Sequence, residues 1–246
     1  MTHNLVADTI SIIGHGGDEI EAYLAQPTDV DRVGSIVVIH HMPGYDDATK
    51  EICRDFAAHG YNALMPNLYS REAPGASPDD AAAVVRANGG VPDERLVGDV
   101  DAAMRHLKSL PHANGRVASI GYCSGGRQSF LAGCRLDLDA VIDCYGAFVT
   151  LDAPADMPFK FKAIVGETPN LSAPLLGLFG ADDKNPTPDQ VGVLERALTD
   201  AGKEFEFHSY EGAGHAFFWV GRPSYRPETA VEAWAVIYEF LGRTLA

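Results

Sequence analysis

A cysteine in a glycine-rich turn is the residue of this sequence best suited to chemistry. The turn reads Gly121-Tyr122-Cys123-Ser124-Gly125-Gly126 and lies between a predicted strand and a predicted helix. It fits the nucleophile-elbow pattern, in which a strained residue stands between glycines that leave room around it. The backbone N–H of Ser124 could donate to an oxyanion, and the dipole of the following helix favours a thiolate. The turn therefore predicts acyl transfer with Cys123 as the nucleophile.

The turn by itself leaves other interpretations open. Glycine-rich turns between a strand and a helix also bind phosphates, and Cys123 could be a small thiol packed at a tight turn. Ser124 could be the nucleophile only if Tyr122 took the place of the first glycine of the pattern. The spacing therefore favours Cys123 over Ser124.

An aspartate pair and a histidine follow in the order that this type of turn requires, which is nucleophile, acid and histidine. Asp182-Asp183 comes just beyond an apolar strand, and His215 follows the last predicted strand. Adjacent aspartates can be a solvated turn, and a histidine between small residues can be a packed loop residue. Three suitable residues, each at the end of a strand, nevertheless predict a Cys-His-Asp triad, because open α/β sheets place their sites there.

Apolar runs alternate with segments of helical period along the chain. The expected strands are Ser35–Ile39, Asn62–Leu68, Arg116–Tyr122, Val141–Tyr145, Pro174–Phe179 and Glu204–His208. Residues 8–13 and 19–24 alternate polar and apolar side chains around Gly16-Gly17, which predicts a hairpin at the edge of the sheet. The pattern predicts one α/β domain over residues 1–246, a mostly parallel twisted sheet with helices on both faces.

Five helices are expected, one of which directly follows the glycine-rich turn, and the other four have clear apolar positions. Their apolar positions are Ala48, Ile52 and Phe56 in the first, Val97, Val100, Met104 and Leu107 in the second, Val191, Leu194 and Leu198 in the third, and Val231, Trp234, Tyr238 and Leu241 in the last. Thr187 is the expected N-cap of the third helix, with Pro188 at its first position. Residues 147–172 have weak periodicity and several prolines, which predicts an irregular excursion and a candidate cover for the active site.

The composition narrows the partners. The 34 acidic residues outnumber the 19 Lys and Arg, and the net charge of -15 argues against binding to nucleic acid or anionic membranes. The N-terminal residues show no signal peptide, and no apolar run approaches the roughly 18 residues of a membrane span. The four cysteines form no CxxC pair, so we expect free thiols and a cytoplasmic location. No metal site is expected from His40 and His41, because adjacent strand residues point to opposite faces.

Three segments resemble the dienelactone hydrolase family, whose members include the carboxymethylenebutenolidases, within the α/β-hydrolase superfamily. They are Gly-Tyr-Cys-Ser-Gly-Gly at 121–126, Gly180-Ala181-Asp182-Asp183 and Gly212-Ala213-Gly214-His215-Ala216-Phe217. A cysteine in the elbow is the most specific of these features. The similarity extends from the turn His40-His41-Met42-Pro43-Gly44 to the last helix, which is nearly the whole chain.

The resemblance implies the α/β-hydrolase fold and a small-molecule ester or lactone as substrate, hydrolysed without a cofactor by a monomer or homodimer. By position, Cys123 would be the nucleophile, His215 the base and Asp183 its orienting acid. Asp183 is preferred to Asp182 because the family's acid stands three residues after the glycine that is Gly180 here. The oxyanion donors would be the backbone N–H groups of Met42 and Ser124.

The chain departs from the family's pattern around the substrate. Members that resemble it have a glutamate beside the resting thiol where this chain has His41. They also have an arginine soon after the catalytic histidine, where this chain reads Ala216-Phe217-Phe218-Trp219 and Arg222 is the first arginine. His41 could hold the thiolate or could only shape its loop. The cations expected near the rim are Arg71, Arg86 and Arg127, any of which could be a surface residue, and Tyr145, Phe217 and Trp219 could line the pocket or the core.

Two interpretations from other functional classes remain. One is a binding protein that keeps the fold without catalysis, against which a complete triad argues. The other is a redox-active thiol protein that pairs Cys123 with a resolving partner such as Cys144. The elbow favours acyl transfer, since redox thiols typically stand in CxxC pairs.

Overall fold

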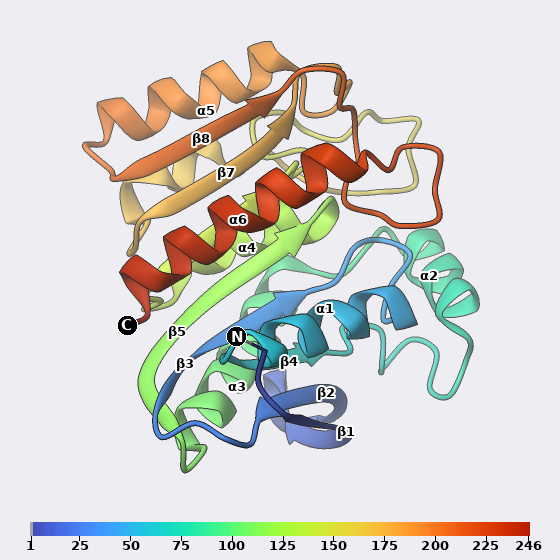
Figure 1. Cartoon of the computed structure of the whole chain (residues 1–246). Helices are drawn as coiled ribbons and strands as arrows, with labels where there is room; N and C mark the ends of the chain where they lie inside the picture. The colour runs from blue at the N-terminus through green and yellow to red at the C-terminus, as the bar shows by residue number, and fades with distance from the viewer. Residues whose placement is uncertain (1) are drawn as a thin grey trace.

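The apolar runs of the sequence form the strands of one sheet in the computed structural model, which describes residues 2–246 (Figure 1). In chain order the strands are β1 (Leu5–Ile13), β2 (Glu19–Pro27), β3 (Val33–Ile39), β4 (Asn62–Pro66), β5 (Ala113–Tyr122), β6 (Ala140–Cys144), β7 (Leu175–Gly180) and β8 (Phe205–Tyr210). They lie in the order β1-β2-β4-β3-β5-β6-β7-β8. The pairings from β4 to β8 are parallel, and those that join β1, β2 and β4 are antiparallel. The predicted mostly parallel sheet and its N-terminal edge hairpin are confirmed.

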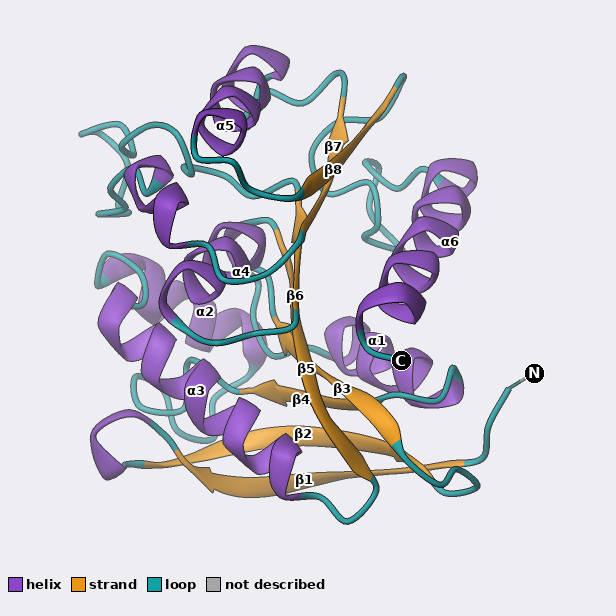
Figure 2. Ribbon diagram, turned by 90° about the vertical axis from the view of Figure 1, so that its left-hand side faces the viewer, coloured by secondary structure: helices purple, strands orange, loops and turns teal. Residues whose placement is uncertain are grey.

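Helices cover both faces of the sheet, as expected (Figure 2). The helices are α1 (Asp47–Ala58), α2 (Pro78–Ala87), α3 (Asp93–Ser109), α4 (Ser124–Arg135), α5 (Pro188–Asp200) and α6 (Pro227–Thr244), with short 3-10 turns η1 (His15–Gly17) and η2 (Val165–Asn170). Helices α1 and α6 lie on one face, and α2, α3, α4 and α5 lie on the other. No helix within residues 2–246 has both the length and the apolar composition needed to cross a membrane.

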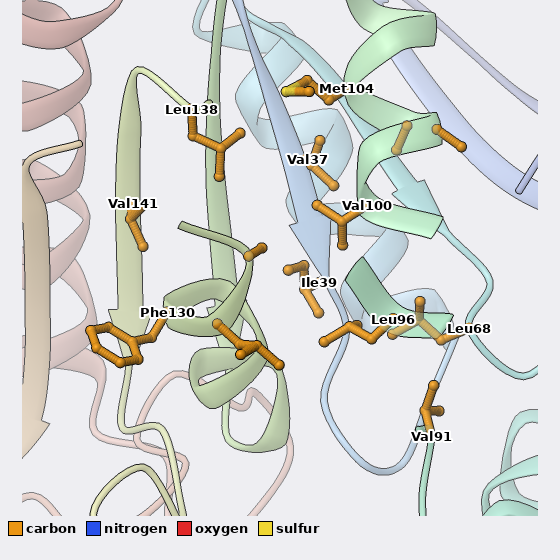
Figure 3. Packing of buried hydrophobic residues seen from close by; sticks show 14 of the residues in the cluster. Val37, Ile39, Leu68, Val91, Leu96, Val100, Met104, Phe130, Leu138 and Val141 are labelled. Atoms are coloured by element: carbon orange, nitrogen blue, oxygen red, sulfur yellow. The ribbon is translucent and has the colours of Figure 1, made fainter. Parts of the chain in front are cut away.

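The core is divided into two layers by the sheet because side chains alternate along each strand. In β3, Val37 and Ile39 face the layer under α3 and α4, whereas Ile36 and Val38 face the layer under α1 and α6, and all four are fully buried. Figure 3 shows the first layer, where the β3 side chains meet those of α3. The carboxyl ends of the central strands are thereby fixed between two packed layers.

Two expectations about helices need correction. The helical segment that was expected to end near Leu107 forms two helices. Gly89 and Gly90 lie between α2 and α3 and have φ of +93° and +98°, which interrupts the helical conformation. Val231 does not share the packed face of α6: it is 71% exposed. The buried stripe of α6 runs instead through Ala230, Ala233, Ile237 and Leu241, whose spacing of three and four residues follows the helix period.

The cap expected for α5 is confirmed, since the Thr187 hydroxyl accepts a hydrogen bond from the backbone of Gln190 in a complete capping box. The excursion at 147–172 packs mainly on α4. Ser172 donates to the Gly133 carbonyl, and the carbonyl of Lys162 accepts from buried Arg127 in the first turn of α4. These contacts hold residues 147–172 against α4, the helix that follows the elbow.

An ion cluster fastens α3 to the turn of the N-terminal hairpin. The guanidinium of Arg71 donates to both oxygens of Asp99 at 2.8 and 2.9 Å and to Asp18 at 2.7 Å. Asp99 is completely buried, so its charge depends on this partner. Removing one member of a buried pair leaves an uncompensated charge, which is far more costly than the pair itself is stabilising.

Replacing the cation in Arg71→Met should lower the free energy of unfolding by about 3–5 kcal/mol. Urea unfolding at neutral pH measures the change. Arg105→Met is the matched control, because Arg105 is 64% exposed in its pair with Asp101, and loss of an exposed pair should cost at most about 1 kcal/mol. Equal effects of the two substitutions would contradict the role given to the Arg71 cluster.

Candidate active site

Cys123 lies at the sharp junction between β5 and α4. Its φ of 58° and ψ of -118° are unusual for a residue with a side chain. Its N–H donates to the Cys144 carbonyl at 3.0 Å, and its own carbonyl accepts from the N–H of Gly126 at 3.0 Å. Strain of this kind persists only where the surroundings fix the backbone, and it concentrates at functional sites.

The glycines on either side of Cys123 are required by contacts between backbones. A Cβ atom added to Gly121 would lie 1.9 Å from the Gly125 carbonyl oxygen. One added to Gly125 would lie 2.3 Å from the carbonyl oxygen of Ile39 and 2.8 Å from that of His40. The start of α4 is therefore pressed against the end of β3, which brings the elbow next to the turn that contains Met42.

Asp183 and His215 are brought together from the ends of β7 and β8. His215 Nδ1 lies 2.9 Å from Asp183 Oδ2, and because an ionised carboxylate can only accept, Nδ1 carries the proton. The Asp183 side chain is almost fully buried, and its second oxygen accepts from the Asn185 N–H at 2.9 Å. Asp182 is exposed, so Asp183 is the aspartate that orients the imidazole.

His215 favours the charged form in this setting. Burial alone would lower its pKa, but hydrogen bonds and charge interactions with Asp183 and Cys123 raise the pKa of His215 to about 10. The hydrogen bond of the ring to Asp183 is well formed, at 2.9 Å.

The two predicted oxyanion donors have free N–H groups. Within residues 2–246, neither the Met42 nor the Ser124 N–H donates to a protein acceptor. The turn that carries Met42 is closed by the Gly44 N–H donating to the His41 carbonyl at 2.9 Å, and the Tyr69 hydroxyl donates to the Met42 carbonyl at 2.9 Å. Free donors on a fixed turn are the arrangement that an oxyanion site needs.

The two adjacent histidines have different surroundings. His40 is buried, and burial lowers its pKa to about 4, so its neutral ring donates from Nδ1 to the His41 carbonyl and accepts from the Leu68 N–H. His41 Nε2 pairs with Asp46 at 2.8 Å, and its ring packs edge-on against Trp219. Burial alone would raise the pKa of Asp46, but His41 and Thr49 lower it to about 2.

The pair His41–Asp46 was not foreseen, although Asp46 shows the N-cap spacing to Thr49 that could have drawn attention to it. Tyr69, which orients the Met42 turn, gave no comparable signal. Groups of three or more His, Cys, Asp or Glu side chains that could hold a metal do not occur in the described part of the chain. Whether His41 tunes the thiol remains a prediction.

The expected rim cations separate into two kinds. Arg71 is held by Asp99 and Asp18, so the expectation that it contacts substrate is not supported. Arg127 is buried and bonds both oxygens of Asp93 at 2.8 and 3.0 Å, which makes it a structural residue. Arg86 is exposed and forms no ion pair with any residue from 2 to 246, and its charge acts on Tyr69 beside the Met42 turn.

Of the expected aromatic residues, Tyr145 contacts His215 directly. The Tyr145 ring lies edge-on to the His215 ring with centroids 5.2 Å apart, and it also contacts Phe217 at 5.1 Å. Tyr145 and Ala216 have φ of 45° and 62°, so strained residues flank the histidine as well as the cysteine. Trp219 is half-buried and lies between His41 and Arg222.

Comparisons with known proteins agree with one another. The model of the family described as "Dienelactone hydrolase family" matches residues 20–245. A protein of Methylorubrum extorquens named "Putative carboxymethylenebutenolidase" is 34% identical over 94% of this chain and 79% of its own length. A Bradyrhizobium protein named "Probable 2-oxo-3-(5-oxofuran-2-ylidene)propanoate lactonase" is 29% identical over 95% of this chain and 92% of its own.

A solved structure shows the same architecture. The crystal structure titled as a putative dienelactone hydrolase from Klebsiella pneumoniae has a TM-score of 0.86 and 27% identity, and the match covers 98% of this chain and 99% of that one. The eight-stranded sheet described above is therefore the α/β-hydrolase fold.

The raised pKa of His215 predicts a pH-dependent stability. A folded-state pKa of about 10 against an ordinary value of 6.5 means that the protonated ring stabilises the fold below about pH 6.5, and that this stabilisation is lost as the pH rises through 10. The difference in unfolding free energy between wild type and His215→Gln should therefore shrink between about pH 6 and pH 10. Denaturant unfolding across that range measures it.

His106→Gln is the matched control. Burial lowers the pKa of His106, so its contribution changes only below the ordinary value of about 6.5, and the difference between wild type and His106→Gln should stay constant from about pH 7.5 to pH 10. A difference between wild type and His215→Gln that stays constant with pH would contradict the charged state assigned to His215.

Proposed function

This chain belongs to the dienelactone hydrolase family, and on that premise we propose that it hydrolyses lactones or small carboxylic esters through a thioester on Cys123. One observation carries the proposal. A cysteine in a strained elbow lies beside a histidine that is oriented by a buried aspartate, with two unpaired N–H groups nearby. The names of the relatives support the choice of a lactone, since one is named as a lactonase.

In the first step the Cys123 thiolate attacks the carbonyl carbon and forms the C–S bond. The carbonyl π electrons move onto oxygen, and the N–H groups of Met42 and Ser124 stabilise that oxyanion, at about 2.7–4 kcal/mol for each donor in comparable sites. As the oxyanion collapses, the C–O bond breaks and protonated His215 gives its proton to the departing alkoxide. In a lactone the alkoxide stays tethered to the acyl group.

In the second step neutral His215 removes a proton from water, and the resulting hydroxide attacks the thioester carbonyl. The C–S bond breaks, the acid is released, and the thiolate and imidazolium are restored. Asp183 keeps the proton on Nδ1 throughout, which leaves Nε2 to exchange protons with substrate and water. No electrons are transferred to or from a cofactor.

The two alternative functions have less support. A binding protein without catalysis has no need of a strained cysteine beside an oriented histidine. In a redox protein Cys144 would have to resolve a Cys123 oxidation product, but Cys144 is completely buried and burial raises its pKa well above the ordinary range. A buried neutral thiol is a poor nucleophile.

Removal of the nucleophile gives the most direct test of this function. Cys123→Ala should lower kcat for a small aryl ester or a lactone by about four orders of magnitude or more, as for other covalent triads. Cys134→Ala is the matched control, because Cys134 lies buried in the helix that follows the elbow and takes no part in the mechanism. Activity of Cys123→Ala near the wild-type level would contradict the proposal.

The charge of Arg86 predicts a preference among substrates. We expect Arg86→Gln to raise KM about tenfold for an ester that carries a free carboxylate, and to leave KM for the neutral methyl ester of the same compound unchanged, since tenfold corresponds to about 1.4 kcal/mol. Arg105→Gln, distant and already paired, serves as control. Equal changes for the two esters would mean that Arg86 does not contact the substrate.

A further inference from the structure

A cleft is lined by residues of α1 and α6, the two helices that cover one face of the sheet (Figure 2), and we call it the α1–α6 cleft. It encloses about 530 Å³. Ala48 and Ile52 of α1 form one wall, and Trp234 of α6, with Phe218 and Trp219 of the loop after His215, forms the other. No role in the mechanism above requires a space on this side of the sheet.

The inner end of the cleft is made by neighbours of the catalytic groups. Tyr122 directly precedes Cys123, Tyr145 contacts the His215 ring, and His41 directly precedes Met42, and all three line the cleft. The Cys123 side chain packs against the same buried apolar cluster as Tyr122 and Tyr145. A molecule bound at Cys123 can therefore extend into this space.

The side of the cleft opposite α1 is aromatic, and its rings already meet one another edge-on. Phe218 lies edge-on to Trp234 with centroids 5.4 Å apart, and Tyr122 lies edge-on to Phe218 at 5.6 Å. An apolar lining that bounds a large concave space is the usual form of a site for a small organic molecule. Aromatic walls suit a flat ring, which can continue the same edge-to-face contacts.

Two polar features restrict the ligand further. The hydroxyl of Tyr122 is buried and has no hydrogen-bond partner within residues 2–246, although Tyr122 itself is 3% exposed. Tyr122 lines the cleft together with Asp55 of α1. The described lining also contains the carboxylates of Glu51 and Asp55 and no lysine or arginine, so it disfavours an anionic ring.

We infer that the α1–α6 cleft binds an uncharged aromatic group of the ester or lactone, with the Tyr122 hydroxyl hydrogen-bonded to an oxygen of that group. The site deepens the proposed function, on which its identity as a substrate site rests. A carboxylate of the substrate would instead be bound by Arg86, which lies on α2 and does not line the cleft. An aromatic group in the cleft and a negative charge at the other end would orient one substrate across Cys123.

The cleft can be probed without turnover because both tryptophans of the chain, Trp219 and Trp234, line it. Titration of the Cys123→Ala variant with benzyl alcohol should change tryptophan emission saturably. Benzoate, which has the same ring and a negative charge, should bind at least tenfold more weakly. Binding in this variant depends on the cleft alone, so the result stands apart from whether Cys123 is the nucleophile.

A substitution that fills the cleft provides the test of location. Ala48 is exposed at the cleft wall, and Ala48→Phe should abolish the response to benzyl alcohol and lower kcat/KM for benzyl acetate at least tenfold, while methyl acetate is hydrolysed as by the wild type. Ala235→Phe is the matched control, because Ala235 is exposed on α6 and does not line the cleft. Tyr122→Phe should weaken benzyl alcohol binding and leave toluene binding unchanged.

The outcomes separate the two claims. A saturable response that Ala48→Phe removes and Ala235→Phe keeps supports the cleft, even if Cys123→Ala were found to retain esterase activity. The inference is overturned if benzyl alcohol gives no saturable response, if Ala48→Phe and Ala235→Phe bind it equally, or if benzoate binds as tightly as the alcohol.

Discussion

The close approach of three backbone segments at Gly121, Gly125 and the end of β3 is the constraint on which the site depends. Because neither glycine has a side chain, α4 can begin against the carbonyls of Ile39 and His40, and Cys123 is forced to a φ of 58°. The same contact brings the Ser124 N–H beside the turn that carries Met42. One piece of backbone packing thus positions both the proposed nucleophile and the proposed oxyanion donors.

The electrostatics of the site depend on burial as well as on charge. A nearly buried Asp183 and the neighbouring Cys123 keep the His215 pKa high although burial opposes it. His40, buried without a charged partner, is driven to the neutral form by the same effect. His215 and His40 therefore differ in pKa because their hydrogen-bond partners differ. The composition of the chain could not predict this difference.

Sequence patterns predicted most of the fold and the order of the candidate triad, because strand periodicity, caps and the glycine-rich turn are local signals. Thr187 and the edge hairpin are examples. The patterns failed where the position of a side chain depends on tertiary contacts. Arg71 was expected near the substrate, but its partner Asp99 is 28 residues away along the chain, and no local spacing announces that pair.

The cleft between α1 and α6 could not be predicted from the sequence for a similar reason. From the sequence, Trp219 could line the pocket or the core, and Trp234 was expected on the packed face of the last helix. Only the packing of two helices on one face of the sheet decides which space the two rings border. His41 and Trp219, the positions at which the sequence was expected to depart from the family's pattern, contact each other and both line the cleft.

The central claim is that the acyl group passes through Cys123, and intact-mass spectrometry of enzyme quenched during turnover of a slow aryl ester tests it most directly. The account predicts a mass increase of one acyl group, located by peptide mapping at Cys123 and removed by hydroxylamine as a thioester is. An acyl group found on Ser124, or turnover in which an initial burst of product leaves no acyl group on Cys123, would contradict it.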